Sequence, residues 1–206
     1  GSATGPDPSS PDRTIPTLGG RGCSIADLDA DGDLDVVVAN HYNGSSGFVN
    51  SAIYLGTPSG PTTAGAVPFG TNWAGAAMIA DMDRNGALDV VMANAYNGSS
   101  YRANSEILYR TTAGTILRTD FFPTIGGYGL QVLDWNGDGN EDVAFSSHYN
   151  GTSYVNDTQY FAGAPAGPGT TATATFPGMG ALHLGTEYGN TYDRGWIERF
   201  ESRVFA

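Results

Sequence analysis

Acidic side chains recur in three short loops of the sequence. In the first loop, aspartates stand at alternate positions from Asp27 to Asp35, with Gly32 at the sixth position. Side chains at positions 1, 3 and 5 can converge on one point, and glycine at position 6 allows the sharp turn. Position 7 offers its backbone carbonyl and position 9 adds a last carboxylate. Because Ca²⁺ prefers several hard oxygen ligands in a flexible loop, the sequence predicts one Ca²⁺ in each loop, about three in all.

The predicted ligands occupy the same five positions in every loop. In the second and third loops, each change at positions 1, 3, 5 and 9 replaces aspartate by asparagine, which keeps a side-chain oxygen. Position 7 varies freely, as expected where only the backbone binds. The ligands are Asp27, Asp29, Asp31, Asp33 and Asp35; Asp81, Asp83, Asn85, Ala87 and Asp89; and Asp134, Asn136, Asp138, Asn140 and Asp142.

An EF-hand, a Mg²⁺ site and a metal-free turn fit the loops less well. An EF-hand loop begins in the same way but ends in glutamate at position 12, where this chain has Val38, Met92 and Phe145. Mg²⁺ rarely uses all-protein sites. Plain hairpin turns without metal would leave carboxylates a few ångströms apart, which repel by roughly 4 kcal/mol per close pair at an effective dielectric near 20.

The loops belong to a longer repeat. The first aspartates, Asp27, Asp81 and Asp134, lie 54 and then 53 residues apart. Each copy reads as an apolar strand, the acidic loop, a β-branched or apolar strand, an Asn-Gly turn, an aromatic strand and a Gly/Pro/Thr-rich link to an outer strand with Pro-Phe or Phe-Pro. Four strands in about 54 residues are the size of one β-propeller blade. The sequence therefore predicts an all-β protein with blades of four antiparallel strands.

The repeats resemble the FG-GAP/VCBS family, whose propeller repeats occur in integrin α-subunits and in many bacterial secreted or surface proteins. The resemblance rests on three copies of the DxDxDGxxD loop and its Asn variants, followed by an apolar run, and covers roughly residues 13–177. It implies that the loops bind Ca²⁺ for structural reasons and that the chain is secreted or displayed at the cell surface. The Phe-Gly…Gly-Ala-Pro element of the family is reduced here to fragments, Phe69-Gly70 and 163–165.

The repeats suggest how the chain is organised. We predict an extended N-terminal segment at 1–12 and a single repeat domain at 13–206. Its blades span about 19–72, 73–125 and 126–177, with a degenerate fourth at 178–206. Closed propellers need at least four blades, so this one is expected to be open or partial. Its edges could be completed by the fourth unit with Thr14–Leu18, by a longer parent chain, or by strand exchange between copies through the N-terminal arm 1–16 or the C-terminal strand.

Composition narrows the function. The net charge of −12 argues against nucleic-acid binding, and no apolar run approaches the length of a membrane helix. One cysteine, Cys23, excludes an intrachain disulfide, and its apolar surroundings predict that it is buried. Sequons at Asn43, Asn97, Asn150 and Asn156 are possible glycosylation sites, although Asn-Gly is also ordinary turn chemistry.

These observations favour a binding role without catalysis. No nucleophile elbow, zinc motif or phosphate loop stands out, and most aspartates lie in the loops, so we do not expect an enzyme. We expect a Ca²⁺-stabilised module for adhesion, for binding extracellular proteins or for self-assembly. One alternative is a lectin that binds glycans through the recurring side chains Tyr42, Tyr96, Tyr149, Asn50, Asn104 and Asn156. The other is a structural filament or surface-coat subunit built by strand exchange.

Overall fold

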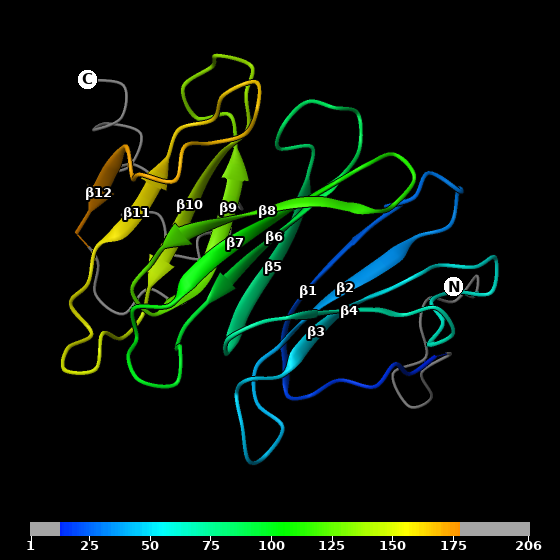
Figure 1. Ribbon diagram of the computed structural model, residues 1–206, viewed down its shortest axis with the longest axis horizontal. Helices are drawn as coiled ribbons and strands as arrows, with labels where there is room; N and C mark the ends of the chain where they lie inside the picture. Colours follow the sequence, from blue (N-terminus) through cyan, green and yellow to red (C-terminus); the bar gives the residue numbers. More distant parts are fainter. Residues whose placement is uncertain (1–12, 178–206) are drawn as a thin grey trace, which may run out of the picture.

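The computed structural model describes residues 13–177 (Figure 1). Within this range the chain forms twelve strands and no helix, arranged as three sheets of four antiparallel strands. The predicted N-terminal segment 1–12 and the predicted fourth unit 178–206 lie outside the described residues, and so does most of the proposed donor arm.

Each sheet is a simple meander whose strands follow one another in chain order. The first sheet contains β1 (Gly20–Ala26), β2 (Asp35–Asn40), β3 (Asn50–Tyr54) and β4 (Val67–Gly70). The second contains β5 (Ala74–Ala80), β6 (Asp89–Asn94), β7 (Asn104–Arg110) and β8 (Ile116–Pro123). The third contains β9 (Gly127–Leu133), β10 (Asp142–Ser147), β11 (Thr158–Phe161) and β12 (Ala174–Phe176). The predicted all-β class is confirmed, and the sheets have the form of open propeller-like blades.

The local sequence accounts for these strands. The second strand of each sheet carries the β-branched or apolar run that follows an acidic loop, and such residues favour a buried pleated surface. Equivalent residues pair in the same register, since Val37 faces Ile53, Val91 faces Ile107 and Ala144 faces Tyr160. The repeat therefore specifies the pairing as well as the strands.

The sheets pack face to face through two apolar cores. One core joins the first and second sheets and contains Val37, Ile53, Val90 and Met92. The other joins the second and third sheets through aromatic rings, with Phe122 and Phe161 centred 5.1 Å apart. The second sheet thus lies between the other two, as Figure 1 shows.

The first strands of the sheets approach closely. A Cβ atom added to Gly75 of β5 would lie 2.4 Å from the carbonyl oxygen of Tyr128 in β9, so only glycine fits there.

Two expectations about the first sheet are wrong. Cys23 is exposed, because the pleat turns Cys23 and Ile25 (58% exposed) to the outward face of β1, away from the second sheet. Residues 14–18, which we expected to be an N-terminal strand available to pair with the fourth unit, form no strand. Ile15 packs instead on the outward cluster of Val38, Ala52 and Tyr54, whose phenol donates to the carbonyl oxygen of Pro16. This stretch therefore covers part of the outward face and leaves the rest exposed.

Candidate calcium loops and a polar pocket

The acidic loops join the first and second strands of each sheet and have the same backbone shape. Position 6 is glycine with a φ of 93° in Gly32 and 85° in both Gly86 and Gly139. Position 4 also lies in the left-handed region, with φ of 60° at Ala30 and 57° at Arg84. The predicted sharp turn is present in all three loops, which orients their odd-numbered side chains alike.

Positions 1 and 5 hold the turn together. The carboxylate of Asp27 accepts hydrogen bonds from the backbone N–H groups of Asp31 and Gly32, at 3.1 and 2.9 Å. Asp81 and Asp134 accept the corresponding bonds in their loops. At position 5 the side chain of Asp31 accepts the N–H of Asp33 at position 7.

Position 9 closes the base of each loop. Asp35 is 1% exposed, and its two oxygens accept the N–H groups of Leu28 and Gly56 at 2.7 and 2.6 Å. Asp89 and Asp142 repeat this arrangement at 0% exposure. These aspartates tie the loop to the end of the third strand through hydrogen bonds that need no metal.

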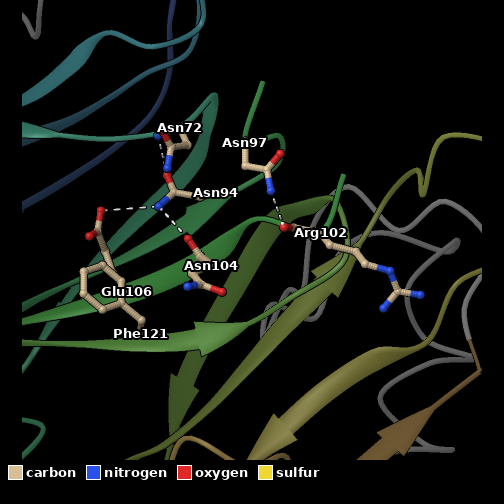
Figure 2. Close-up of a pocket in the computed structure, with 7 residues that line it drawn as sticks. All are labelled: Asn72, Asn94, Asn97, Arg102, Asn104, Glu106 and Phe121. Carbon is tan, nitrogen blue, oxygen red and sulfur yellow. Dashed lines mark hydrogen bonds between the residues drawn. The ribbon is translucent and has the colours of Figure 1, made fainter. Parts of the chain in front are cut away.

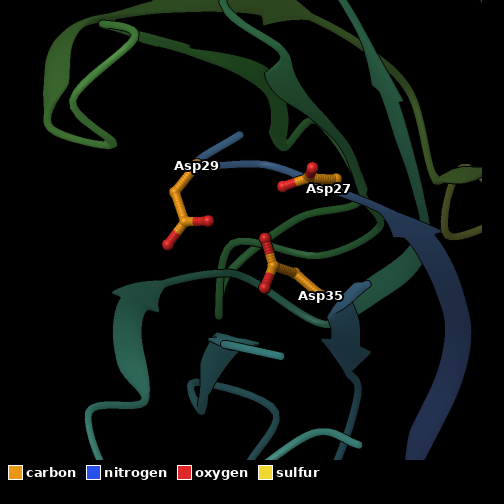
Figure 3. A group of neighbouring side chains, drawn as sticks. All are labelled: Asp27, Asp29 and Asp35. Carbon is orange, nitrogen blue, oxygen red and sulfur yellow. The ribbon is translucent and has the colours of Figure 1, made fainter. Parts of the chain in front are cut away.

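Position 3 closes no turn, although Oδ2 of Asp83 forms an ion pair with Arg118 at 3.5 Å. One carboxylate oxygen, Oδ1, of Asp29 and of Asp83 is buried without a hydrogen-bond partner among the described residues. Oxygen atoms of Asp27, Asp29 and Asp35 all lie within 4.8 Å of one another, and those of Asp81, Asp83 and Asp89 do the same. Figure 3 shows three of the five carboxylates of the first loop, those of Asp27, Asp29 and Asp35, turned toward a common space. A buried, unpaired carboxylate oxygen beside two more carboxylates fits a hard cation such as Ca²⁺.

Burial and charge repulsion both disfavour the ionised form of carboxyl groups in the first two loops. Burial, followed by the neighbouring carboxylates of Asp35 and Asp31, raises the pKa of Asp29 above its ordinary value. Burial also raises the pKa of Asp89 to about 6. The loops therefore hold their negative charge at a penalty that a bound cation would relieve.

The third loop differs from the other two. Asn136 replaces the aspartate at position 3, and its amide donates to Asp138 at 2.9 Å. Asn140 at position 7 also donates its side-chain amide to Asp138. With fewer carboxylates, this loop satisfies more of its oxygens internally, so we expect the weakest ion affinity here. The carbonyl oxygens of Asp33, Ala87 and Asn140 remain predicted ligands.

Arg110 is a site residue that the loop pattern does not reveal. It is 2% exposed, and its guanidinium donates to the carbonyl oxygens of Leu28 in the first loop, Leu88 in the second and Gly114. The other two repeats have glycine here, Gly56 and Gly163, whose N–H groups make the same bond to position 9. An arginine at a repeat position otherwise held by glycine was the available signal.

The Asn-Gly turns lie at the opposite end of each sheet, between the second and third strands. The side-chain oxygens of Asn43, Asn97 and Asn150 accept backbone N–H groups two and three residues ahead. All three asparagines are exposed and remain predicted glycosylation sites. Asn156 is 7% exposed and its amide nitrogen donates to the carbonyl oxygens of His148 and Ser153, which makes it unsuitable as a glycan acceptor.

Aromatic rings connect these turns. Trp73 lies between Tyr42 and Tyr96, and Tyr101 continues the series to Tyr149, with ring centroids 4.9–5.6 Å apart. The phenols of the repeated tyrosines Tyr42, Tyr96 and Tyr149 donate to carbonyl oxygens within their own turns. The rings therefore brace the turns, and their hydroxyl groups are already occupied.

A polar pocket of about 240 Å³ lies beside the turn of the second repeat. Figure 2 shows its lining, Asn72, Asn94, Asn97, Arg102, Asn104, Glu106 and Phe121. Glu106 is 6% exposed, and its one hydrogen bond from the described residues comes from the amide of Asn94 at 3.3 Å. Burial raises the pKa of Glu106 to about 7.

This buried carboxyl group predicts a pH dependence of stability. Its pKa is raised from 4.5 to about 7 on folding, so the folded state holds the proton more tightly. Protonated Glu106 therefore stabilises the folded state fully below its ordinary pKa of 4.5. This contribution is lost as the pH rises from 4.5 through about 7. Measured by urea unfolding in saturating Ca²⁺, the advantage of Glu106→Gln over the unmodified protein should grow by about 3 kcal/mol across this window. Both proteins share all other titrating groups, so a constant difference would show that Glu106 is not desolvated.

A comparison with protein-family models gives a match. Residues 27–92 match the model of the FG-GAP-like repeat family, from the first acidic loop to the strand after the second. This match confirms the resemblance seen in the loop motifs. No curated protein matches the chain. Between residues 13 and 177 there is no helix long and apolar enough to cross a membrane.

Proposed function

We propose that this chain, which carries an FG-GAP-like repeat at residues 27–92, is an extracellular binding module whose blades are stabilised by Ca²⁺. The observation that carries the calcium assignment is the pair of buried, unpartnered oxygens of Asp29 and Asp83, each among three convergent carboxylates. Each ion would be held by side-chain oxygens of positions 1, 3, 5 and 9 and by the carbonyl of position 7. The ion supplies positive charge that offsets the repulsion within the loop.

Removing Ca²⁺ should lower the melting temperature. An ion that binds only the folded state adds roughly 2.7 kcal/mol per site at a hundredfold excess over its Kd. We expect calorimetric titration of chelator-treated protein to give about three ions per chain, with the third loop filling last. We expect EGTA to lower the melting temperature markedly in a calorimetric scan.

Position 3 provides the matched control for this experiment. Asp29→Asn and Asp83→Asn reproduce the side chain that the third loop carries as Asn136. Each variant should weaken the binding of one ion and lower the melting temperature in Ca²⁺. In EGTA, Asp29→Asn should melt like the unmodified protein, whereas Asp83→Asn also loses its ion pair with Arg118. Equal melting with and without chelator would contradict the calcium assignment.

We also propose that copies of the chain associate through the outward face of the first sheet. This face exposes Ile25, Leu34 (62% exposed) and Cys23, the side against which a further blade would pack. A longer parent chain or another extracellular protein could fill the same role. Light scattering that finds only monomers, with and without Ca²⁺, would remove self-association.

Catalysis, location and higher assembly are further parts of the proposal. We propose no catalytic role, because most of the described carboxylates lie in the three acidic loops. Secretion or display at the cell surface follows from the usual location of FG-GAP repeats.

The filament alternative rests on the same exposed face, and electron microscopy of the native assembly distinguishes it from a monomeric adhesion module. The lectin alternative depends on the polar pocket of the second repeat.

A further inference from the structure

The polar pocket is built on a framework that two repeats share. In the second repeat, the amide of Asn94 donates to the carbonyl oxygen of Asn104 at 2.9 Å and accepts the N–H of Asn72 at 3.2 Å. In the first repeat, Asn40 makes the same two bonds, to Asn50 and from Leu18, at 2.8 Å each. The backbone around the pocket is therefore held in the same way in both repeats.

The side chains placed on this framework differ sharply. Across the third and fourth strands, Glu106 pairs with Phe121 in the second repeat, where Ala52 pairs with Pro68 in the first. Asn72 takes the place of Leu18. In the third repeat these three positions are Ile125, Gln159 and Thr175. Of the three described repeats, the second alone combines an amide, a carboxyl group and an aromatic ring here.

Several polar groups of the pocket remain available. The amides of Asn94 and Asn97 are used by the framework and the turn. Among the described residues, by contrast, the side-chain amides of Asn72 and Asn104 have no hydrogen-bond partner, and Glu106 has only Asn94. A carboxyl group that is 6% exposed is expensive to bury with a single long hydrogen bond. The pocket thus presents two free amides and an under-satisfied carboxyl group to a ligand.

We propose that this pocket binds a single neutral sugar unit through its hydroxyl groups. A sugar hydroxyl both donates and accepts, so it can donate to Glu106 and exchange hydrogen bonds with Asn72 and Asn104. Phe121 is 53% exposed at the rim and offers its ring to the C–H face of the sugar. The volume of about 240 Å³ suits one ring rather than a larger ligand.

The proposal gives a ligand class to the binding role proposed above, but its test is independent of the calcium assignment. The Ca²⁺-saturated protein is titrated with glucose, galactose, mannose, fucose, xylose and N-acetylglucosamine, and binding is followed by saturation-transfer and amide-shift NMR. We expect at least one sugar to bind at millimolar concentration and to shift the amide signals of Asn72, Asn104 and Glu106.

Variants that copy the first repeat make this test specific. Glu106→Ala and Asn72→Leu install the residues that Ala52 and Leu18 already provide on the same framework, so the fold should be kept. Each variant should lower the affinity for the sugar by about tenfold or more, because it removes a hydrogen bond to the ligand. Asn104→Ala should also weaken it, whereas Asn50→Ala, the equivalent change in the first repeat, should leave affinity unchanged.

Three results would overturn the proposal. In one, none of the six sugars binds the unmodified protein at up to about 50 mM, a concentration well above the millimolar Kd expected for a sugar. In another, a sugar binds with equal affinity to Glu106→Ala and Asn72→Leu, which places its site elsewhere. In the third, methylammonium binds and displaces the sugar at lower concentration, which makes the pocket a cation site.

Discussion

Replacing Asp35 by alanine is expected to lower the free energy of unfolding by about 4 kcal/mol in EGTA, and by more in Ca²⁺, because Asp35 is also a predicted ligand of the ion. The carboxylate is buried and accepts the N–H groups of Leu28 and Gly56 at 2.7 and 2.6 Å. Each hydrogen bond to a charged acceptor is worth about 1.5–3 kcal/mol, and its loss leaves a buried donor unpaired. Urea unfolding in Ca²⁺ and in EGTA measures both values.

Asp29→Ala is the comparison that separates the two functions of the loop. Asp29 accepts no hydrogen bond at its buried Oδ1, so its removal should matter in Ca²⁺ and have little effect in EGTA. Burial and neighbouring carboxylates raise its pKa, so without the ion its loss relieves repulsion. If Asp35→Ala left the free energy of unfolding in EGTA unchanged, the hydrogen bonds from Leu28 and Gly56 to Asp35 would not stabilise the fold.

Arg110→Gly should have an effect of similar size. The guanidinium is buried between the first two loops and donates to three carbonyl oxygens. Burial lowers the pKa of Arg110, and the carboxylates of Asp35, Asp29 and Asp89 oppose that shift. Removing one member of a buried charged network costs about 3–5 kcal/mol, because the remaining charges and carbonyl groups lose their partner. Glycine is the residue at this position in the other repeats, so the bond from the backbone N–H to Asp89 can persist.

Arg13→Ala provides the control for the loss of an arginine. Arg13 is exposed, and its side chain donates to the carbonyl oxygen of Ser59 at the surface. Its removal should change the free energy of unfolding by less than about 1 kcal/mol. Since Arg110 links the loops, Arg110→Gly should also weaken Ca²⁺ binding at the first and second loops in calorimetric titration. If Arg110→Gly lowered the free energy of unfolding by no more than Arg13→Ala does, the proposed role of Arg110 in linking the two loops would be contradicted.

The repeat made most of the fold predictable. Three acidic loops at nearly constant spacing, each followed by an apolar run and an Asn-Gly turn, located the strands, because every copy reports the same pattern independently. The convergence of positions 1, 3 and 9 in two loops was also predictable, since alternating side chains must meet inside a tight turn. The different roles of Asp29 and Asp35 could not be predicted, because both are aspartates of the same loop. They differ only in the backbone N–H groups that lie within hydrogen-bond distance.

The remaining features depend on contacts between repeats or on single departures from the pattern. The exposure of Cys23 depends on which face of β1 meets a neighbouring sheet, and the local apolar sequence does not specify that face. Arg110 and Glu106 are ordinary residues within one strand and gain their roles from the first sheet and from Asn94. Comparing the copies position by position, rather than through their shared motif, would have drawn attention to both.

The asparagine framework has a consequence for how such a protein can change over time. Asn40 and Asn94 secure the backbone, whereas the neighbouring positions, Leu18 and Ala52 or Asn72 and Glu106, are free to differ. Duplicated blades with this framework keep the same backbone geometry, while the side chains beside the framework asparagine can change independently in each blade. Recognition chemistry can be gained in one blade and lost in another by a few substitutions, while the scaffold that carries them is preserved.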